Sequence, residues 1–152
     1  MFNPDFKEFV QLLNSYQVRY LVIGGYAVAY HGHPRYTKDL DIWLDVSKAN
    51  AKRVVAVLAE FGFESLGYTE RDFTEPNHVV QLGQPPMRID LLVGLESLSF
   101  RRCFASRMTV EVDGIKVNMI DRASLIRSKR SAGRTQDLAD VEQLERWPKA
   151  EP

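Results

Sequence analysis

Apolar and polar positions alternate along the chain with two distinct periods, and the period of each stretch predicts its secondary structure. Helical spacing recurs in four longer stretches and two short ones: 4–16, 48–61, 121–129 and 135–147, then 26–30 and 96–103. Apolar or alternating runs predict strands over 19–23, 39–44, 63–68, 78–82, 87–91, 108–112 and 115–119. The mixture predicts an α+β (α/β) fold: a mixed β-sheet with helices packed on one face, followed by a short C-terminal helical pair.

Residues that favour the ends of elements set the boundaries of this pattern. The predicted helix N-caps are Asn3, Ser47 and Asp121, and the predicted helix terminators are Gly62 and Gly133. Hairpin turns are predicted at 83–86 and 113–114, and a loop at 69–76. No repeat or low-complexity segment divides the chain. We therefore expect one domain over residues 1–152, with a core at about 17–119 and C-terminal helices at about 121–147.

A glycine pair follows the first predicted strand. The run Tyr20–Ile23 is apolar throughout, which is typical of a strand buried on both faces. It ends in Gly24 and Gly25, and the small-residue stretch 26–30 then predicts one to two turns of helix. A strand that passes through glycines into a helix presents free N–H groups and the positive end of the helix dipole. The junction is therefore a candidate phosphate site.

Three aspartates lie on two of the predicted strands. Asp39 and Asp41 are two residues apart, so their side chains point to the same face while the residue between them points into the core. Adjacent carboxylates repel each other unless a cation lies between them, and oxygen ligands favour Mg²⁺. Asp90 interrupts another apolar strand, where a carboxylate is costly to bury unless it is paired or metal-bound. If the two strands are neighbours, the three carboxylates form one cluster facing the glycines.

The composition narrows the functional classes. The chain has 152 residues, 45% of them hydrophobic and 26% charged, which is typical of a globular protein with its own core. Its 20 basic and 20 acidic residues give a net charge of zero. This argues against a protein that binds long nucleic acid through its overall charge, but not against one with a local basic patch. Cys103 is the single cysteine, so no internal disulfide can form. No signal-peptide pattern or membrane-length apolar run is present, and we expect a cytoplasmic protein without membrane interaction.

Basic residues lie just before the first two acids and again near the C-terminus. Arg35, Thr37 and Lys38 could contact phosphate oxygens or hold the carboxylates in place. The segment 122–134 contains five basic residues and no acid, and could neutralise a triphosphate or an RNA backbone.

Two acids follow this segment. Asp137 and Asp140 are three residues apart on one predicted helical face, where they could orient Lys129 and Arg134 or face the cleft. We interpret them as structural support for those two cations.

The spacing of these residues resembles that of nucleotidyltransferases of the polymerase-beta type. Their signature is a hydrophobic residue, Gly-Gly or Gly-Ser, a spacer, Asp-x-Asp, and a distant third acid on a neighbouring strand. The matching residues here are Gly24, Gly25, Asp39, Asp41 and Asp90. The residues around the glycine pair, Arg35-x-Thr37-x-Asp39, and the tail from Leu125 to Asp140 are similar to small prokaryotic members. Those members include AbiEii-like toxins of toxin–antitoxin pairs and antibiotic nucleotidyltransferases, and the resemblance runs from about residue 20 to about residue 144.

The resemblance implies a metal-dependent transfer of a nucleoside monophosphate from a nucleoside triphosphate to a hydroxyl acceptor. It implies that Asp39, Asp41 and Asp90 are both catalytic and metal-binding, with two Mg²⁺ ions as cofactor and Mn²⁺ as an alternative. The residues that it implies for nucleotide binding are Gly24, Gly25, Arg35, Thr37, Lys129 and Arg134.

The resemblance leaves the acceptor open. We favour an RNA 3′ end or a protein, with an antitoxin as a further partner, because the C-terminal helices offer little room for a drug pocket. An antibiotic or other small-molecule acceptor is the alternative. A nucleotide-binding module without turnover is a second hypothesis. A third is an unrelated α/β protein in which the three carboxylates never meet.

Overall fold

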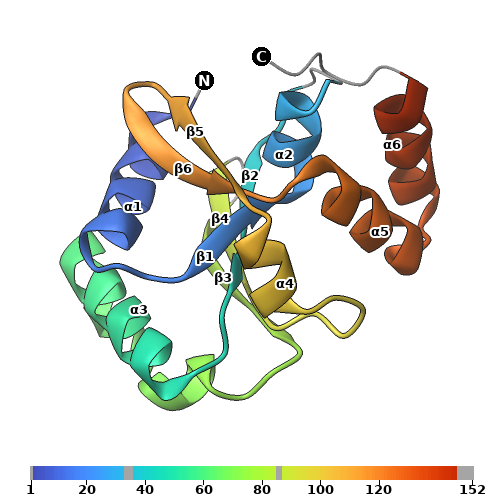
Figure 1. Ribbon diagram of the computed structural model, residues 1–152. Helices are drawn as coiled ribbons and strands as arrows, with labels where there is room; N and C mark the ends of the chain where they lie inside the picture. Colours follow the sequence, from blue (N-terminus) through green and yellow to red (C-terminus); the bar gives the residue numbers. More distant parts are fainter. Residues whose placement is uncertain (1, 33–35, 85–86, 147–152) are drawn as a thin grey trace.

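The fold is built on a six-stranded mixed sheet (Figure 1). The computed structural model describes residues 2–32, 36–84 and 87–146. From edge to edge the strands follow the order β3-β4-β2-β1-β6-β5. Their bounds are β1 Tyr20–Ile23, β2 Asp39–Leu44, β3 His78–Gln84, β4 Met87–Val93, β5 Met108–Val112 and β6 Ile115–Met119. Both predicted hairpins are confirmed, since β3 pairs with β4 and β5 with β6 in antiparallel fashion.

Three helices begin directly after the predicted N-caps Asn3, Ser47 and Asp121. The helix bounds are α1 Pro4–Ser15, α2 Gly24–Tyr30, α3 Lys48–Phe61, α4 Phe100–Ala105, α5 Arg122–Ala132 and α6 Thr135–Arg146. The Asn3 side chain accepts a hydrogen bond from the Phe6 N–H at 2.9 Å, and Ser47 and Asp121 cap α3 and α5 in the same way. The φ angle of Gly62 is 103°, which a residue with a side chain rarely adopts, so α3 ends there as predicted.

Strand β1 lies in the middle of the sheet and is buried along its whole length, as the sequence predicts. It pairs antiparallel with β2 and parallel with β6. Strand β2 in turn pairs parallel with β4, so the two acid-bearing strands are neighbours.

Helices cover both faces of the sheet, whereas the sequence predicted one covered face. On the first face, the Tyr20 hydroxyl donates a hydrogen bond to Asn14 Oδ1 of α1 at 2.8 Å. Tyr20 is in register with Leu44, so Trp43 points to the opposite face. There its ring meets Phe100 of α4 edge-on, with 5.2 Å between centroids. The one-face prediction was wrong because β2 carries a large apolar residue on the second face, and burying it requires a helix there.

The predicted strand at 63–68 is absent from the structure. Residues Glu64–Leu66 form a 3₁₀ turn instead, labelled η1. The glycines on either side, Gly62 and Gly67, both have left-handed φ angles, which reverse the chain twice within a few residues. An extended run cannot form between two such reversals, and the backbone groups are paired inside the turn.

Two neighbouring predictions also need correction. The predicted loop 69–76 contains a second 3₁₀ turn, η2 Glu70–Phe73, which begins at a capping box between Thr69 and Asp72 and buries Phe73. The helix predicted over 96–103 begins only at residue 100, because Ser99 is its N-cap and accepts a hydrogen bond from the Arg102 N–H at 3.3 Å.

The C-terminal pair α5 and α6 stands beside the sheet (Figure 1). Two apolar residues within the predicted C-terminal helices, Ala123 and Leu138, are exposed. The buried face of α6 carries Val141 and Leu144 together with two aspartates, which shift the buried stripe of the helix away from Leu138. The last predicted helical residue, Trp147, lies outside the described residues.

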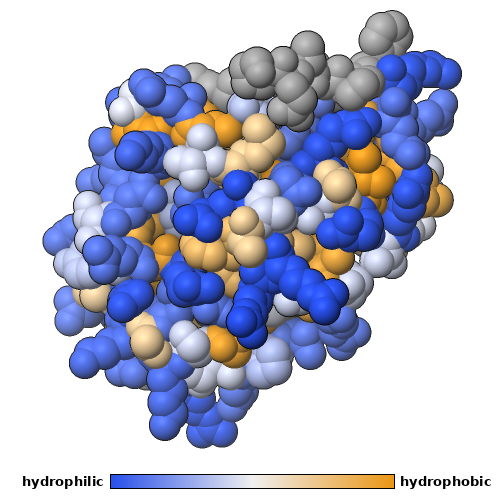
Figure 2. Space-filling model, viewed as in Figure 1, coloured by the Kyte–Doolittle hydropathy of each residue, from blue (hydrophilic) through white to orange (hydrophobic). Residues whose placement is uncertain are grey.

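The outer surface of the protein is mixed in character. On the face shown in Figure 2, hydrophobic residues form separate patches among predominantly hydrophilic ones. None of the helices in residues 2–32, 36–84 and 87–146 combines the length and the apolar character that crossing a bilayer requires.

Candidate functional site

The pairing of β2 with β4 brings the three aspartates together. Asp41 is directly opposite Asp90 in the parallel register, and Asp39 precedes Asp41 by two residues on the same face. The prediction that the strands are neighbours is therefore confirmed. The hypothesis of an unrelated protein in which the carboxylates never meet is wrong.

Gly24 lies against the middle of this cluster. Its φ angle is +69°, and a Cβ atom added to it would stand 2.1 Å from Asp41 Oδ2. Any side chain at this position would collide with the carboxylate, and the backbone angle would be strained as well. The glycine thus allows the β1–α2 junction to approach the carboxylate directly.

The aspartates open into a cleft of about 880 Å³, which we call the carboxylate cleft. It lies between the ends of β1, β2 and β4 on one side and helix α5 with the start of α6 on the other. Among its lining residues are Gly24, Gly25, Thr37, Asp39, Asp41, Asp90, Lys129, Arg134 and Asp137.

Asp41 has the most perturbed carboxyl group in the cleft. Burial is the first cause, and the negative charges of Asp90 and Asp39 add to it, so that the pKa of Asp41 is raised to about 7. Lys129 and Arg88 act in the opposite direction, but their positive charges are too weak to restore the ordinary value. The shift shows that the buried cluster contains too little positive charge for three ionised carboxylates, and a bound cation could supply it.

Arg88 provides the positive charge that the cluster does contain. Its guanidinium donates to both carboxylate oxygens of Asp90, at 2.8 and 3.1 Å, and to Asp39 Oδ2 at 3.3 Å. The hydrogen bond to Asp90 and the charges of the aspartates raise the pKa of Arg88, which keeps it protonated. Sequence reasoning missed this residue, although its position two residues before Asp90 places both on one face of β4.

On the opposite wall of the cleft, the cations are held by acids from α6. Lys129 Nζ lies 3.4 Å from Asp137 Oδ1 and 3.0 Å from Asp140 Oδ2. Arg134 Nε donates to Asp137 Oδ2 at 2.7 Å, while most of its side chain is exposed. Burial alone would raise the pKa of Asp137, but the hydrogen bond from Arg134 and the charges of both cations lower it. The prediction that the two aspartates orient these cations is confirmed by the contacts.

The remaining predicted residues have different outcomes. Gly25 is buried at the start of α2 and lines the cleft. Thr37 also lines it, and its hydroxyl donates to the Asp39 carbonyl at 3.3 Å, so it supports the start of β2. Arg35 lies outside the described residues. An exposed aromatic residue that the sequence reasoning did not single out, Tyr36, lines the cleft near Thr37.

The donor atoms of the cluster suit a hard cation such as Mg²⁺ or Mn²⁺, since they are carboxylate oxygens only. Their present arrangement is less suitable. Among the described residues, no three acidic, histidine or cysteine side chains are grouped as ready metal ligands. Arg88 explains this, because it engages Asp39 and Asp90 with the oxygens that a cation would need. The residues therefore fit a divalent cation by chemistry, provided that Arg88 releases at least one carboxylate.

Comparisons with known proteins agree with this geometry. Residues 5–145 match the family model described as "Nucleotidyltransferase of unknown function (DUF6036)". The fold is similar to a crystal structure of a protein from Thermotoga maritima that is provisionally described as a nucleotidyltransferase, with a TM-score of 0.61. The two chains are 16% identical, and the similarity covers 96% of each. No protein of curated function matches the sequence.

Proposed function

The chain belongs to this family of nucleotidyltransferases of unknown function, and from that premise we propose that it transfers a nucleoside monophosphate from a nucleoside triphosphate to a hydroxyl acceptor. The observation that carries the proposal is the register of β2 and β4, with Asp41 opposite Asp90 and Gly24 pressed against Asp41. Three converging carboxylates beside a backbone free of side chains suit a triphosphate with its cations.

Each carboxylate has a distinct role in the proposal. Asp39 and Asp41 would hold the cation that accompanies the triphosphate, and Asp90 would hold a second one beside the acceptor. Two Mg²⁺ ions, when bound, supply the positive charge that stabilises the attacking and leaving oxygens of an in-line phosphoryl displacement. In the proposal, Asp90 would also accept the proton of the acceptor hydroxyl, directly or through a water molecule. Gly24 and Gly25 allow the backbone to approach the phosphates.

Lys129 and Arg134 complete the proposed nucleotide site from the other wall. Their positive charges reach Asp41 across the cleft, where each interacts with its carboxylate. Arg134 is largely exposed and can turn towards a pyrophosphate leaving group, whereas Lys129 is fixed by two buried acids and acts from one position.

For the acceptor we propose an RNA 3′ end or a protein hydroxyl, and a biological role as the toxin of a toxin–antitoxin pair. Support comes from the lining of the cleft, which includes the apolar residues Val79, Leu92 and Leu95 as well as the aspartates. The apolar side of the cleft would accommodate a nucleobase or an aromatic side chain next to Asp90. An antibiotic or other small-molecule acceptor is the alternative within the same reaction class.

One observation favours a second candidate, nucleotide binding without turnover. Arg88 already neutralises Asp39 and Asp90, and a chain that never released them would bind a nucleotide without holding two catalytic cations. The variant Arg88→Gln separates the two candidates. A catalyst should respond with altered transfer and altered dependence on Mg²⁺ concentration, whereas a binding module should show no transfer before or after the change.

The proposed function is tested by incubating the protein with each α-labelled nucleoside triphosphate, Mg²⁺ and total cellular RNA. Label on RNA or on protein, separated by nuclease and protease treatment, would identify the acceptor class. Nucleotide binding without transfer to either would leave a small-molecule acceptor or the binding module. Failure to bind any nucleotide would contradict the proposal.

Two matched variants make this test specific. Asp90→Asn removes one carboxylate of the cleft and should abolish transfer. Asp5→Asn makes the same change in the first turn of α1, at an exposed aspartate that does not line the cleft, and should leave transfer intact.

A further inference from the structure

A second cavity lies at the other end of strand β1. It has a volume of about 800 Å³ and is bordered by the end of α1, the start of β1, helix α3, the end of α4 and the β5–β6 hairpin. We call it the basic groove. Its charged lining residues are Arg19, Arg53, Arg107 and Lys116, and none of its described lining residues is acidic. In a chain of zero net charge, this is a local concentration of positive charge.

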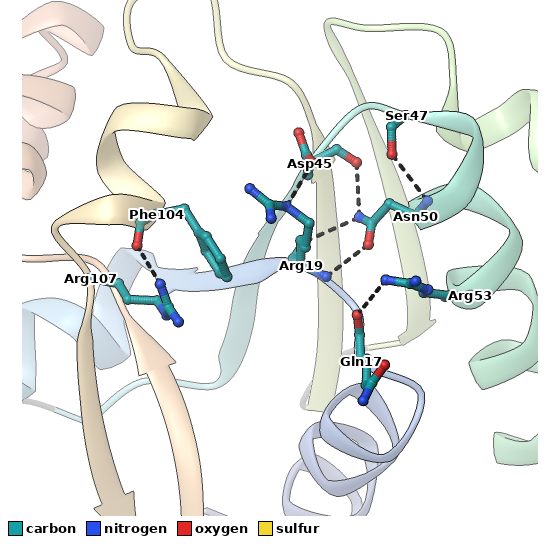
Figure 3. A network of polar contacts seen from close by, with 8 residues as sticks. All are labelled: Gln17, Arg19, Asp45, Ser47, Asn50, Arg53, Phe104 and Arg107. Carbon is teal, nitrogen blue, oxygen red and sulfur yellow. Dashed lines mark hydrogen bonds and ion pairs between the residues drawn. The ribbon is translucent and has the colours of Figure 1, made fainter.

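The arginines of the basic groove are fixed in place, in large part by neutral groups. Arg53 Nη1 donates to the Gln17 carbonyl at 3.1 Å, and Arg107 Nη1 donates to the Phe104 carbonyl at 2.8 Å. Figure 3 shows the Phe104 ring between two guanidinium groups, whose Cζ atoms lie 3.9 Å (Arg107) and 4.6 Å (Arg19) from its centroid. Such cation–π contacts orient a guanidinium without neutralising it.

Acids beside the groove compensate only some of this charge. Asp45 pairs with Arg19 at 3.0 Å, and Glu111 is opposite Lys116 in the β5–β6 register. Within the described part of the chain, Arg53 and Arg107 form no ion pair with an acid, and each uses one N–H in the hydrogen bonds given above. A guanidinium carries five N–H donors in a fork that matches phosphate oxygens, so both residues retain donors that could bind an anion.

From this arrangement we propose that the basic groove binds the sugar–phosphate backbone of a polynucleotide. The cations come from four separate elements around an open groove, which suits successive phosphates of a chain better than one compact anion. The flanking amides and hydroxyls of Asn14, Gln17 and Thr109 add hydrogen-bonding groups suited to sugars and phosphates.

The groove and the carboxylate cleft are close enough to serve one long ligand. Arg19 and Gly24 are five residues apart along an extended segment, which corresponds to about 16 Å at about 3.3 Å per residue. A polynucleotide of several residues is longer than this separation, so its backbone could lie in the groove while its end lies in the cleft. RNA binding in the groove does not require nucleotide transfer. It can therefore be confirmed or contradicted independently of the proposed function.

The experiment measures binding of a fluorescein-labelled single-stranded RNA of about twelve nucleotides by anisotropy, without nucleotide or Mg²⁺. For Arg53→Gln with Arg107→Gln we expect binding at least about tenfold weaker at moderate salt, since two charge-assisted contacts are lost. The slope of log K against log salt should become shallower by about 1.4, because each contact with single-stranded phosphate contributes about 0.7.

Two further double variants keep the result interpretable. Arg71→Gln with Arg101→Gln removes the same charge from exposed positions that line neither cavity, and should leave RNA binding close to that of the original protein. Arg53→Lys with Arg107→Lys keeps the charge and should retain most of the salt slope, and thermal unfolding verifies that all variants fold. No RNA binding by the intact protein, or an equal loss in the Arg71 and Arg101 control, would overturn the proposal.

Discussion

The carboxylate cleft and the basic groove lie at opposite ends of β1 and handle charge in opposite ways. In the cleft, Arg88, Lys129 and Arg134 are paired with aspartates and the exposed Lys38 also lines it, yet burial and the neighbouring carboxylates still raise the pKa of Asp41 to about 7. In the groove, Arg53 and Arg107 contact carbonyls and a ring instead of acids.

This difference indicates which kind of ligand the site at each end of β1 can bind. A cleft with internally paired cations and excess carboxylates favours a ligand that brings its own cations, such as a magnesium-bound triphosphate. A groove with uncompensated guanidiniums favours a ligand that brings only negative charge. A net charge of zero for the whole chain conceals both properties.

The largest expected effect comes from removing a carboxylate of the cleft. Asp90→Asn should lower the rate of nucleotide transfer by at least about 10²–10⁴-fold, because it removes a proposed base and cation ligand together. RNA binding by the groove should not change. The two regions would have to be regarded as one site if anisotropy showed RNA binding falling together with transfer.

Breaking the buried ion pairs of α5 and α6 should have the next largest effect. Lys129→Met leaves Asp137 and Asp140, which are 3% and 1% exposed, without their shared cation, and should destabilise the fold by about 3–5 kcal/mol. Arg130→Met breaks the exposed pair with Glu145 and should cost less than about 1 kcal/mol. Urea unfolding of both variants measures the contrast, and equal values would show that burial of the pair is irrelevant.

The raised pKa of Asp41 also predicts that the stability of the metal-free protein depends on pH. The pKa of Asp41 is about 7 in the folded state against 3.8 for the ordinary group, so between these values the folded state retains a proton that the unfolded state loses. Stability should therefore fall as the pH rises through this window, by up to roughly 4 kcal/mol.

The variant Asp41→Asn isolates this contribution. It cannot ionise, so its free energy of unfolding should lack the decline between about pH 4 and pH 7 and exceed that of the original protein near pH 8. Unfolding curves in the presence of a chelator across this range test the point. Parallel pH profiles for the two proteins would assign the decline to other groups.

Alanine substitutions at two glycines should have a smaller effect. They should distinguish Gly24, which lies against Asp41, from Gly62, which ends helix α3. Gly62→Ala places a side chain at φ 103° in open space, which should cost about 1–2 kcal/mol. Gly24→Ala adds a contact of 2.1 Å with Asp41 Oδ2 to a similar backbone strain, so it should cost about 1–3 kcal/mol more. It should also weaken nucleotide binding, which calorimetry can measure and which Gly62→Ala should not affect.

The smallest effect is expected at the groove. Asp45→Asn breaks a half-exposed pair with Arg19 and should change stability by less than about 1 kcal/mol. It should slightly strengthen RNA binding, since it frees one more guanidinium. A weaker RNA affinity in the anisotropy assay would mean that Asp45 helps to position Arg19.

The parts of the fold that depend on local pattern were predictable from the sequence. Strand β2, the caps of α1, α3 and α5, and both hairpins follow from periodicity and from residues with strong end preferences. The convergence of Asp41 with Asp90 was predicted on one condition, that their strands are neighbours, and the sheet order meets it.

The parts that were missed depend on contacts between distant segments. Arg88 is a lone arginine in the sequence, and only the adjacency of β2 and β4 gives it Asp39 as a partner. Leu138 is exposed because the inward face of α6 is occupied by two aspartates that meet Lys129, an arrangement that hydrophobic periodicity cannot anticipate. Helix α4 lies on the second face of the sheet because its Phe100 packs against Trp43 and buries that side chain.

The direct pairing of Asp41 with Asp90 has a consequence for how the sequence can vary in length. Because side chains alternate along a strand, an insertion or deletion of one residue inside β4 would turn Asp90 towards the packed side of the sheet and bring a neighbouring Ile89 or Leu91 into the cleft. Folding and chemistry would fail together, so no intermediate form could be retained. Changes of length in this part of the chain are therefore expected in the turn between β3 and β4, and the strands themselves should keep a constant length.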